Sequence, residues 1–75
     1  MTEIVEKPAI IQQIEKARWC FELTNSWHPG IIVLGRSDYE QLVAACPAIE
    51  YQFNGKVYDG LEIHRSELEH ELKVL

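Results

Sequence analysis

IIVLGRSDYEQLVAACP, residues 31–47, is the stretch that decides the fold. Ile31–Leu34 is an unbroken apolar run rich in β-branched residues, which is typical of a central strand covered on both faces. Gly35 ends the run, and Ser37-Asp38-Tyr39-Glu40 has the spacing of a capping box, which predicts the start of a helix. Pro47 cannot continue a helix, so this second element should end just before it. A central strand followed directly by a short helix is therefore the expected centre of the fold.

The segment before this strand has the pattern of a long amphipathic helix over residues 7–24. Pro8 suits the first helical turn, where its missing N–H has no cost. Apolar residues at spacings of four, three and four form one stripe: Ile10, Ile14, Ala17 and Phe21. Trp19 and Leu23 are four residues apart and lie beside the stripe. We expect the stripe to pack on the sheet.

The segment after Pro47 alternates between apolar and polar residues over Ile49–Phe53, which predicts a strand. Asn54-Gly55 can adopt the positive φ angles of a type I′ hairpin turn. The returning strand would be Lys56–Tyr58, and Tyr51 would then lie opposite Tyr58 on one face of the sheet. The sequence therefore predicts a hairpin here.

The last part of the chain adds a turn at Asp59-Gly60 and another alternating strand at Leu61–His64. Ser66–Glu69 repeats the capping-box spacing, so we expect a helical turn at residues 67–70 and then a strand, although residues 71–75 also suit a helix end. The whole chain, residues 1–75, is expected to be a single small α+β domain. Its two layers would be a three- to four-stranded, mostly antiparallel sheet and the long N-terminal and short second helices.

The charge of the chain is unevenly distributed. Residues 1–36 carry four basic and four acidic side chains, whereas residues 37–75 carry three basic and eight acidic ones and so hold the whole net charge of −5. Direct binding to nucleic acid needs the opposite sign, so we do not expect it. The acidic half would instead meet a basic partner or simply keep the protein in solution. The acidic N-terminus and the lack of a long apolar run predict no membrane span and a cytoplasmic location.

Residue types that carry chemistry occur without a diagnostic spacing. Cys20 and Cys46 form no CxxC pair, and we expect both to be reduced, although a disulfide between them stays open. A thiol site would need Cys20 beside a histidine, and a zinc site would need His64 and His70 with Glu67 or Glu71. Neither grouping has the close spacing typical of such sites, and no phosphate-binding glycine motif is present. We therefore expect no enzyme and no cofactor.

Aromatic and acidic residues are the better candidates for function. Exposed aromatic side chains are enriched at protein interfaces, where they anchor the partner. The sequence predicts a protein-binding surface made of rings and carboxylates: Trp27, Tyr51, Tyr58, Glu62, Glu67, Glu69 and Glu71.

The order of elements from residue 31 to residue 75 carries a resemblance. An apolar strand is followed by a helix with Tyr39 and Leu42, a Gly60-Leu61-Glu62-Ile63 strand, Ser66 and a closing strand at Leu72–Leu75. This order resembles the C-terminal part of the peripheral domain of tailed-bacteriophage major capsid proteins. The chain departs from that family in its much smaller size and in having Glu62 where the family often has proline. The resemblance implies a small phage- or prophage-encoded protein and carries over no catalytic residue.

Taken together, the residues predict a small non-enzymatic interaction or assembly module that binds a protein, either a second copy of itself or a basic host protein. One alternative is an acidic inhibitor that mimics nucleic acid and occupies the basic site of a host protein. A thiol or metal enzyme is the second alternative.

Overall fold

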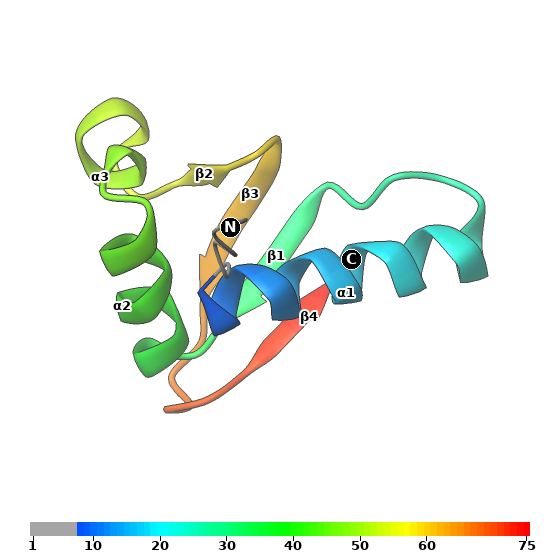
Figure 1. Ribbon diagram of the computed structural model, residues 1–75, viewed down its shortest axis with the longest axis horizontal. Coiled ribbons are helices and arrows are strands. Elements are labelled where there is room, and N and C mark those ends of the chain that lie inside the picture. The colour runs from blue at the N-terminus through cyan, green and yellow to red at the C-terminus, as the bar shows by residue number, and fades with distance from the viewer. Residues whose placement is uncertain (1–7) are drawn as a thin grey trace, which may run out of the picture.

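The computed structural model describes residues 8–75, which form an open four-stranded sheet with helices packed on one side (Figure 1). The α+β class and the two-layer arrangement predicted from the sequence are confirmed. The elements in chain order are α1 (Ala9–Asn25), β1 (Ile31–Leu34), α2 (Arg36–Ala45), α3 (Ala48–Phe53), β2 (Val57–Tyr58), β3 (Leu61–Arg65) and β4 (Leu72–Val74).

The sheet has the strand order β2-β3-β1-β4, so β1 lies inside it, as its apolar run predicts. β1 pairs parallel with β3 and antiparallel with β4, and β2 pairs antiparallel with β3. The chain therefore crosses from one side of β1 to the other between β3 and β4, through residues 66–71. Two of the three pairings are antiparallel, which agrees with the expected mostly antiparallel sheet.

The prediction that β1 is covered on both faces is wrong. Ile32 and Leu34 are fully buried beneath the helices, whereas Ile31 and Val33 on the other face are only half-buried. Within residues 8–75 no helix lies on this second face, because α1 and α2 both pack against the first. The continuous apolar run of β1 therefore serves one buried face and one partly open face.

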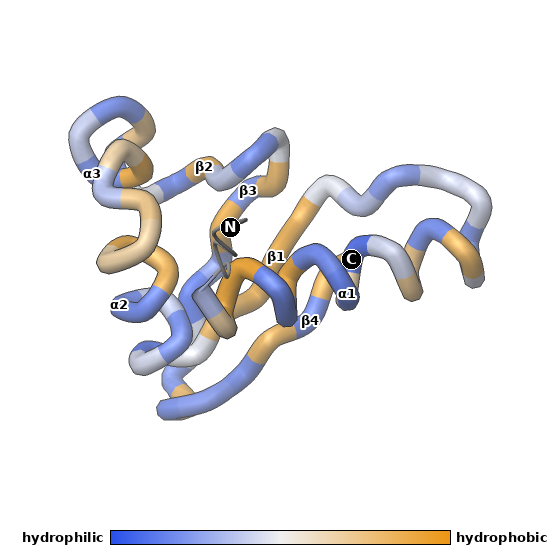
Figure 2. The backbone as a smooth tube through the Cα atoms, viewed as in Figure 1, coloured by the Kyte–Doolittle hydropathy of each residue, from blue (hydrophilic) through white to orange (hydrophobic). Residues whose placement is uncertain are grey.

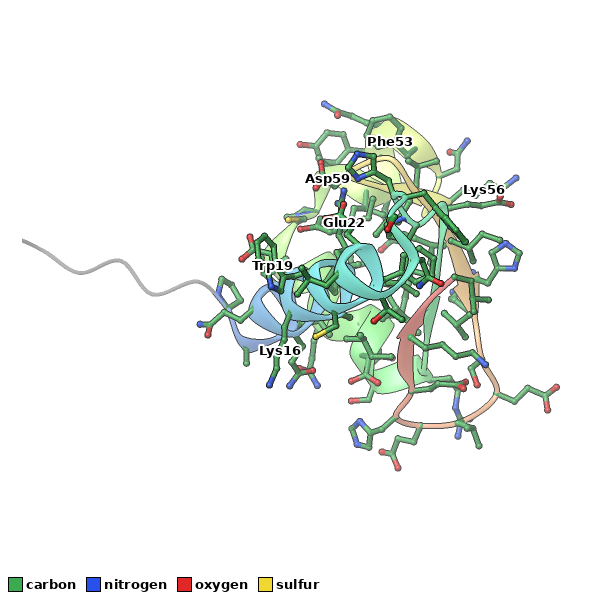
Figure 3. All side chains as sticks on the ribbon, turned by 90° about the vertical axis from the view of Figure 1, so that its right-hand side faces the viewer. Lys16, Trp19, Glu22, Phe53, Lys56 and Asp59 are labelled. Carbon is green, nitrogen blue, oxygen red and sulfur yellow. The ribbon has the colours of Figure 1, made fainter. Side chains whose placement is uncertain are left out.

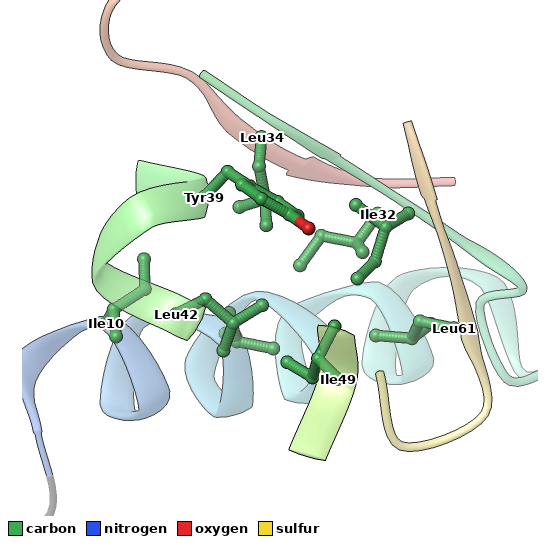
Figure 4. Close-up of a cluster of buried hydrophobic side chains, with 9 residues drawn as sticks. Ile10, Ile32, Leu34, Tyr39, Leu42, Ile49 and Leu61 are labelled. Carbon is green, nitrogen blue, oxygen red and sulfur yellow. The ribbon is translucent and has the colours of Figure 1, made fainter. Parts of the chain in front are cut away.

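The hydrophobic core lies between the sheet and the helices (Figure 4). α1 contributes the predicted stripe, of which Ile10 and Ile14 are buried and Ala17 and Phe21 are half-buried. Figure 2 shows apolar residues along β1 and in the first turns of α1. The buried apolar side chains are Ile10, Ile14, Ile32, Leu34, Tyr39, Leu42, Ile49, Leu61 and Ile63.

The predicted hairpin after Pro47 is wrong, because Ile49–Phe53 lies in the helix α3 and not in a strand. Asn54 and Gly55 have the positive φ angles of 53° and 71°, but these end α3. The N–H groups of both residues point back to the carbonyl oxygen of Ile49, which is the usual left-handed end of a helix. The same residue pair suits a hairpin turn or a helix end, and burial decides between them: α3 buries Ile49 and leaves Tyr51 and Phe53 exposed.

Both predicted capping boxes are also absent. α2 begins at Arg36, earlier than Ser37 predicts, and its first N–H groups donate to loop carbonyls: Arg36 to Leu68 at 2.9 Å and Ser37 to Glu69 at 2.9 Å. Residues 67–70 form bends instead of the expected helical turn, since the Leu68 and Glu69 carbonyls accept hydrogen bonds from the first N–H groups of α2. The strand that follows them is present as β4, as expected.

Asp38 holds this loop in place from the first turn of α2. Its carboxylate is buried and accepts a hydrogen bond from the backbone N–H of Glu71 at 2.7 Å, with the His70 ring 3.5 Å away. Gly35 lets the loop approach, because a Cβ atom there would lie 2.5 Å from the Glu71 nitrogen. The loop at residues 66–71 and the start of α2 therefore form one tightly packed unit.

Candidate protein-docking surface

The C-terminal half of α1 extends past the end of the sheet (Figure 1). The helix ends where Ser26 adopts a left-handed conformation and donates its N–H to the Glu22 carbonyl at 3.0 Å. The chain then returns to the sheet at Gly30, whose N–H donates to the Leu75 carbonyl at 2.9 Å. The last turns of α1 thus stand over a loop and not over the sheet, and no other element of residues 8–75 covers their outer face.

Two large apolar side chains lie on that outer face. Trp19 is 64% exposed and Leu23 is 67% exposed, and their spacing of four residues places them side by side on the helix. Figure 3 shows Trp19 pointing away from the sheet. We call Trp19 and Leu23 the α1 patch. A partner that fully buried this pair would gain about 1.5–3 kcal/mol from each side chain.

Charged groups border the α1 patch. A shallow hollow beside Trp19 is lined by the carboxyl-bearing residues Glu15, Glu22 and Asp59 and by a single guanidinium, Arg18. The Arg18 Nη1 atom lies 2.6 Å from the Asp59 Oδ2 atom and thereby ties α1 to the turn between β2 and β3. Because three acidic groups meet one basic group, the hollow favours a partner with positive charge. Lys16 lies on the opposite flank of Trp19 (Figure 3).

Of the residues predicted from the sequence, Trp27 lies just past the end of the helix that carries the α1 patch. It follows α1 directly, is 63% exposed, and packs edge-on against Phe21 with ring centroids 6.3 Å apart. The Nδ1 atom of the neighbouring His28 lies within hydrogen-bonding distance of the Glu22 carboxylate. Trp27 therefore adds an aromatic group at the end of α1.

The two predicted tyrosines do not join Trp27. Tyr51 is 75% exposed on α3, which lies at the opposite end of the long axis of the molecule from the loop that carries Trp27 (Figure 1). Tyr58 is half-buried on β2 and packs against the core beside Leu61. Because Tyr51 is helical, the two rings do not share a face of the sheet. Burial raises the pKa of the Tyr58 hydroxyl above its ordinary value of 10.0, and the nearby Cys46, Asp59 and Glu15 raise the pKa further.

The predicted carboxylates are divided among three places. Glu62 lies on the open face of β3, where it is 3.2 Å from His64. Glu67 and Glu69 lie in the loop at residues 66–71, and Glu71 precedes β4 with its carboxylate 3.9 Å from Lys73. The predicted surface of rings and carboxylates is therefore not one contiguous patch.

Sequence reasoning missed Trp19 and Leu23 as functional residues. Their four-residue spacing off the buried stripe was visible, and it indicated a second apolar face on the same helix. What the sequence did not show is whether a further element covers that face. In residues 8–75 the helices and the sheet form only two layers, and Trp19 and Leu23 lie on the face of α1 turned away from the sheet.

The groups considered for catalysis are scattered over the structure. Cys20 is an exposed free thiol on α1, and Cys46 is a half-buried free thiol after α2. Among residues 8–75, no three histidine, cysteine, aspartate or glutamate side chains are grouped so that they could hold a metal ion.

No helix in that part of the chain is both long and apolar enough to cross a membrane. Comparisons with protein-family models, curated proteins and solved structures gave no match.

Proposed function

We propose that the protein is a small non-enzymatic interaction module that docks onto a partner protein through the end of α1. One observation carries the proposal: Trp19 and Leu23 form an exposed apolar pair beside a hollow that holds three acidic groups and one basic group. Tryptophan is among the residues that most often dominate binding energy at interfaces, and charges around it set the choice of partner.

The partner that fits this surface presents an apolar segment flanked by lysine or arginine. Its apolar side chains would cover Trp19 and Leu23, and its basic side chains would reach Glu22 and Asp59. The net charge of −5 would speed the encounter with such a protein at low salt. We place this activity in the cytoplasm. We assign it an assembly role, which agrees with the resemblance to phage capsid proteins. For a phage-encoded chain, the partner is a basic protein of the host or the phage.

The experiment uses three forms of the protein as bait. Proteins that bind to them are identified by mass spectrometry, and the partner is then purified for affinity measurements. The wild type is compared with Trp19→Ser/Leu23→Ser and with Leu68→Ser, a control that removes a similarly exposed apolar side chain (58%) from the loop at residues 66–71, outside the α1 patch. Circular dichroism establishes that all three forms are folded. The proposal expects the purified partner to bind the double variant at least tenfold more weakly than the wild type and the control.

Salt dependence tests the electrostatic half of the proposal. The dissociation constant for the purified partner should rise several-fold between low and physiological ionic strength, because the charges at the rim are exposed and screened by salt. A partner that binds all three forms equally would exclude the α1 patch as the docking surface. Binding that depends on the acidic residues of the loop at 66–71, and not on Trp19, would favour the nucleic-acid mimic instead.

A further inference from the structure

The outer edge of β4 carries backbone groups that point away from the sheet. Ile31 and Leu75 exchange both of their backbone hydrogen bonds, at 3.2 and 2.9 Å, and Gly35 donates to the Glu71 carbonyl at 2.8 Å. In an antiparallel pair the bonded positions alternate, so Lys73 also bonds toward β1. The N–H and C=O groups of Leu72 and Val74 must therefore point outward. No strand of residues 8–75 lies beyond β4.

Exposed edges of this kind are usually protected by a charge that repels a second copy. β4 has Lys73, but the residue two positions earlier is Glu71, with its carboxylate 3.9 Å from the Lys73 ammonium. Both side chains lie on the face away from the helices, because Lys73 pairs with Val33 of the open face. The edge therefore presents one negative and one positive side chain in a row. That arrangement can complement itself in an antiparallel pairing.

We propose that β4 pairs antiparallel with β4 of a second copy, with Leu72 opposite Leu72. The outward N–H and C=O groups of the two copies meet only in registers that place Leu72 or Val74 of one copy opposite Leu72 or Val74 of the other. The register Leu72 to Val74 sets Lys73 against Lys73, which is unfavourable, and Val74 to Val74 sets Lys73 against Leu75. Leu72 to Leu72 sets Glu71 of each copy against Lys73 of the other, which gives two favourable cross-strand charge pairs.

This pairing joins two sheets into one of eight strands around a two-fold axis. The half-buried side chains of Leu72, which face the helices, would lie opposite one another, with Val74 of each copy diagonal to Leu72 of the other, and would lose further contact with water. The α1 patch supplies none of the groups that pair in this contact. The dimer would therefore present two docking surfaces, and its existence does not depend on the proposed function.

The test is the molar mass in solution, measured by sedimentation equilibrium over a wide range of protein concentration. The wild type should pass from monomer to dimer. Lys73→Glu sets Glu against Glu in the proposed register and should weaken the dimer at least tenfold. The double variant Glu71→Lys/Lys73→Glu exchanges the two charges and should restore the wild-type dissociation constant. Lys56→Glu makes the same charge change on an exposed residue before β2, at the other edge of the sheet, and should have no effect.

Leu72→Pro provides a second, independent test. Proline removes the outward N–H of residue 72, which forms the central bonded pair of the proposed register, but no bond to β1, so it should abolish the dimer while the far-ultraviolet circular dichroism spectrum stays unchanged. A wild type that is monomeric at every concentration would overturn the proposal. So would a dimer that Lys73→Glu leaves intact, or one that the double charge exchange does not restore.

Discussion

Replacing Asp38 with alanine should remove a large part of the stability of the protein, because this carboxylate joins α2 to the segment leading into β4. Asp38 is only 8% exposed, and its Oδ2 atom accepts the Glu71 backbone N–H at 2.7 Å. A hydrogen bond to a charged group contributes about 1.5–3 kcal/mol. The negative charge in the first turn of α2 adds about 0.3–1 kcal/mol through the helix dipole. We therefore expect the free energy of unfolding to fall by about 2–3 kcal/mol.

This loss is large for a chain of 75 residues. A domain of this size has a free energy of unfolding of about 4–11 kcal/mol, at roughly 0.05–0.15 kcal/mol per residue. One kcal/mol shifts Tm by about 4–8 °C in such a domain, so the Asp38→Ala protein should melt about 10–20 °C below the wild type. Urea unfolding, followed by tryptophan fluorescence, should show a lower midpoint with an unchanged slope against urea concentration.

Two further variants separate this reasoning from the capping-box prediction. Asp38→Asn keeps an oxygen that can accept the Glu71 N–H, so it should be less destabilising than alanine. Ser37→Ala should change the free energy of unfolding by less than about 0.5 kcal/mol, since the Ser37 side chain caps no N–H of α2. A true N-cap serine would instead cost about 1 kcal/mol when replaced. If Ser37→Ala proved as harmful as Asp38→Ala, our account of how α2 begins would be refuted.

Two more predictions concern a glycine and a tyrosine. Gly35→Ala should destabilise the protein by about 1–3 kcal/mol or more, because the new Cβ would lie 2.5 Å from the Glu71 nitrogen. Gly30→Ala is the control. Its Cβ would have no heavy atom within 4 Å, so it should be nearly neutral in the same urea titration. Burial raises the pKa of the Tyr58 hydroxyl in the folded protein, so the unfolded chain loses this proton at a lower pH than the folded protein does. The contribution of Tyr58 to the free energy of unfolding is therefore fully present below the ordinary pKa of 10.0 and is lost as pH rises through the folded pKa. Tyr58→Phe should therefore lose less stability than the wild type above pH 10, and equal losses in both proteins would contradict the raised pKa.

The parts of the fold that the sequence predicts correctly are those in which one physical requirement allows one structure. The stripe at Ile10 and Ile14 has a period that only a helix can bury on one side, and Pro47 leaves α2 no way to continue. Ile31–Leu34 is too short and too β-branched for a helix, so it forms a strand. In each of these cases the local pattern and the tertiary structure favour the same conformation.

The errors arise where a local pattern has two solutions of similar energy. Asn54-Gly55 suits both a hairpin turn and a helix end, and the choice depends on how Ile49 reaches the core. Ser66 was expected to cap a helix, but its hydroxyl accepts the Leu68 N–H two residues on, at 3.1 Å, in a turn. The carbonyls that a helix at residues 67–70 would have used are taken by Arg36 and Ser37. Contacts this distant along the chain leave no trace in a short window of sequence.

The two proposed interaction surfaces have a common physical origin in the two-layer arrangement of an open sheet. α1 buries one stripe against the sheet, with Ile10 and Ile14 in the core, and carries Trp19 and Leu23 on its opposite face. No element of residues 8–75 adds a third layer over that face. β4 is an edge strand, and no strand of residues 8–75 pairs with its outer side. A fold with two layers and an open sheet edge therefore leaves both the outer face of α1 and the edge of β4 for other protein surfaces to cover.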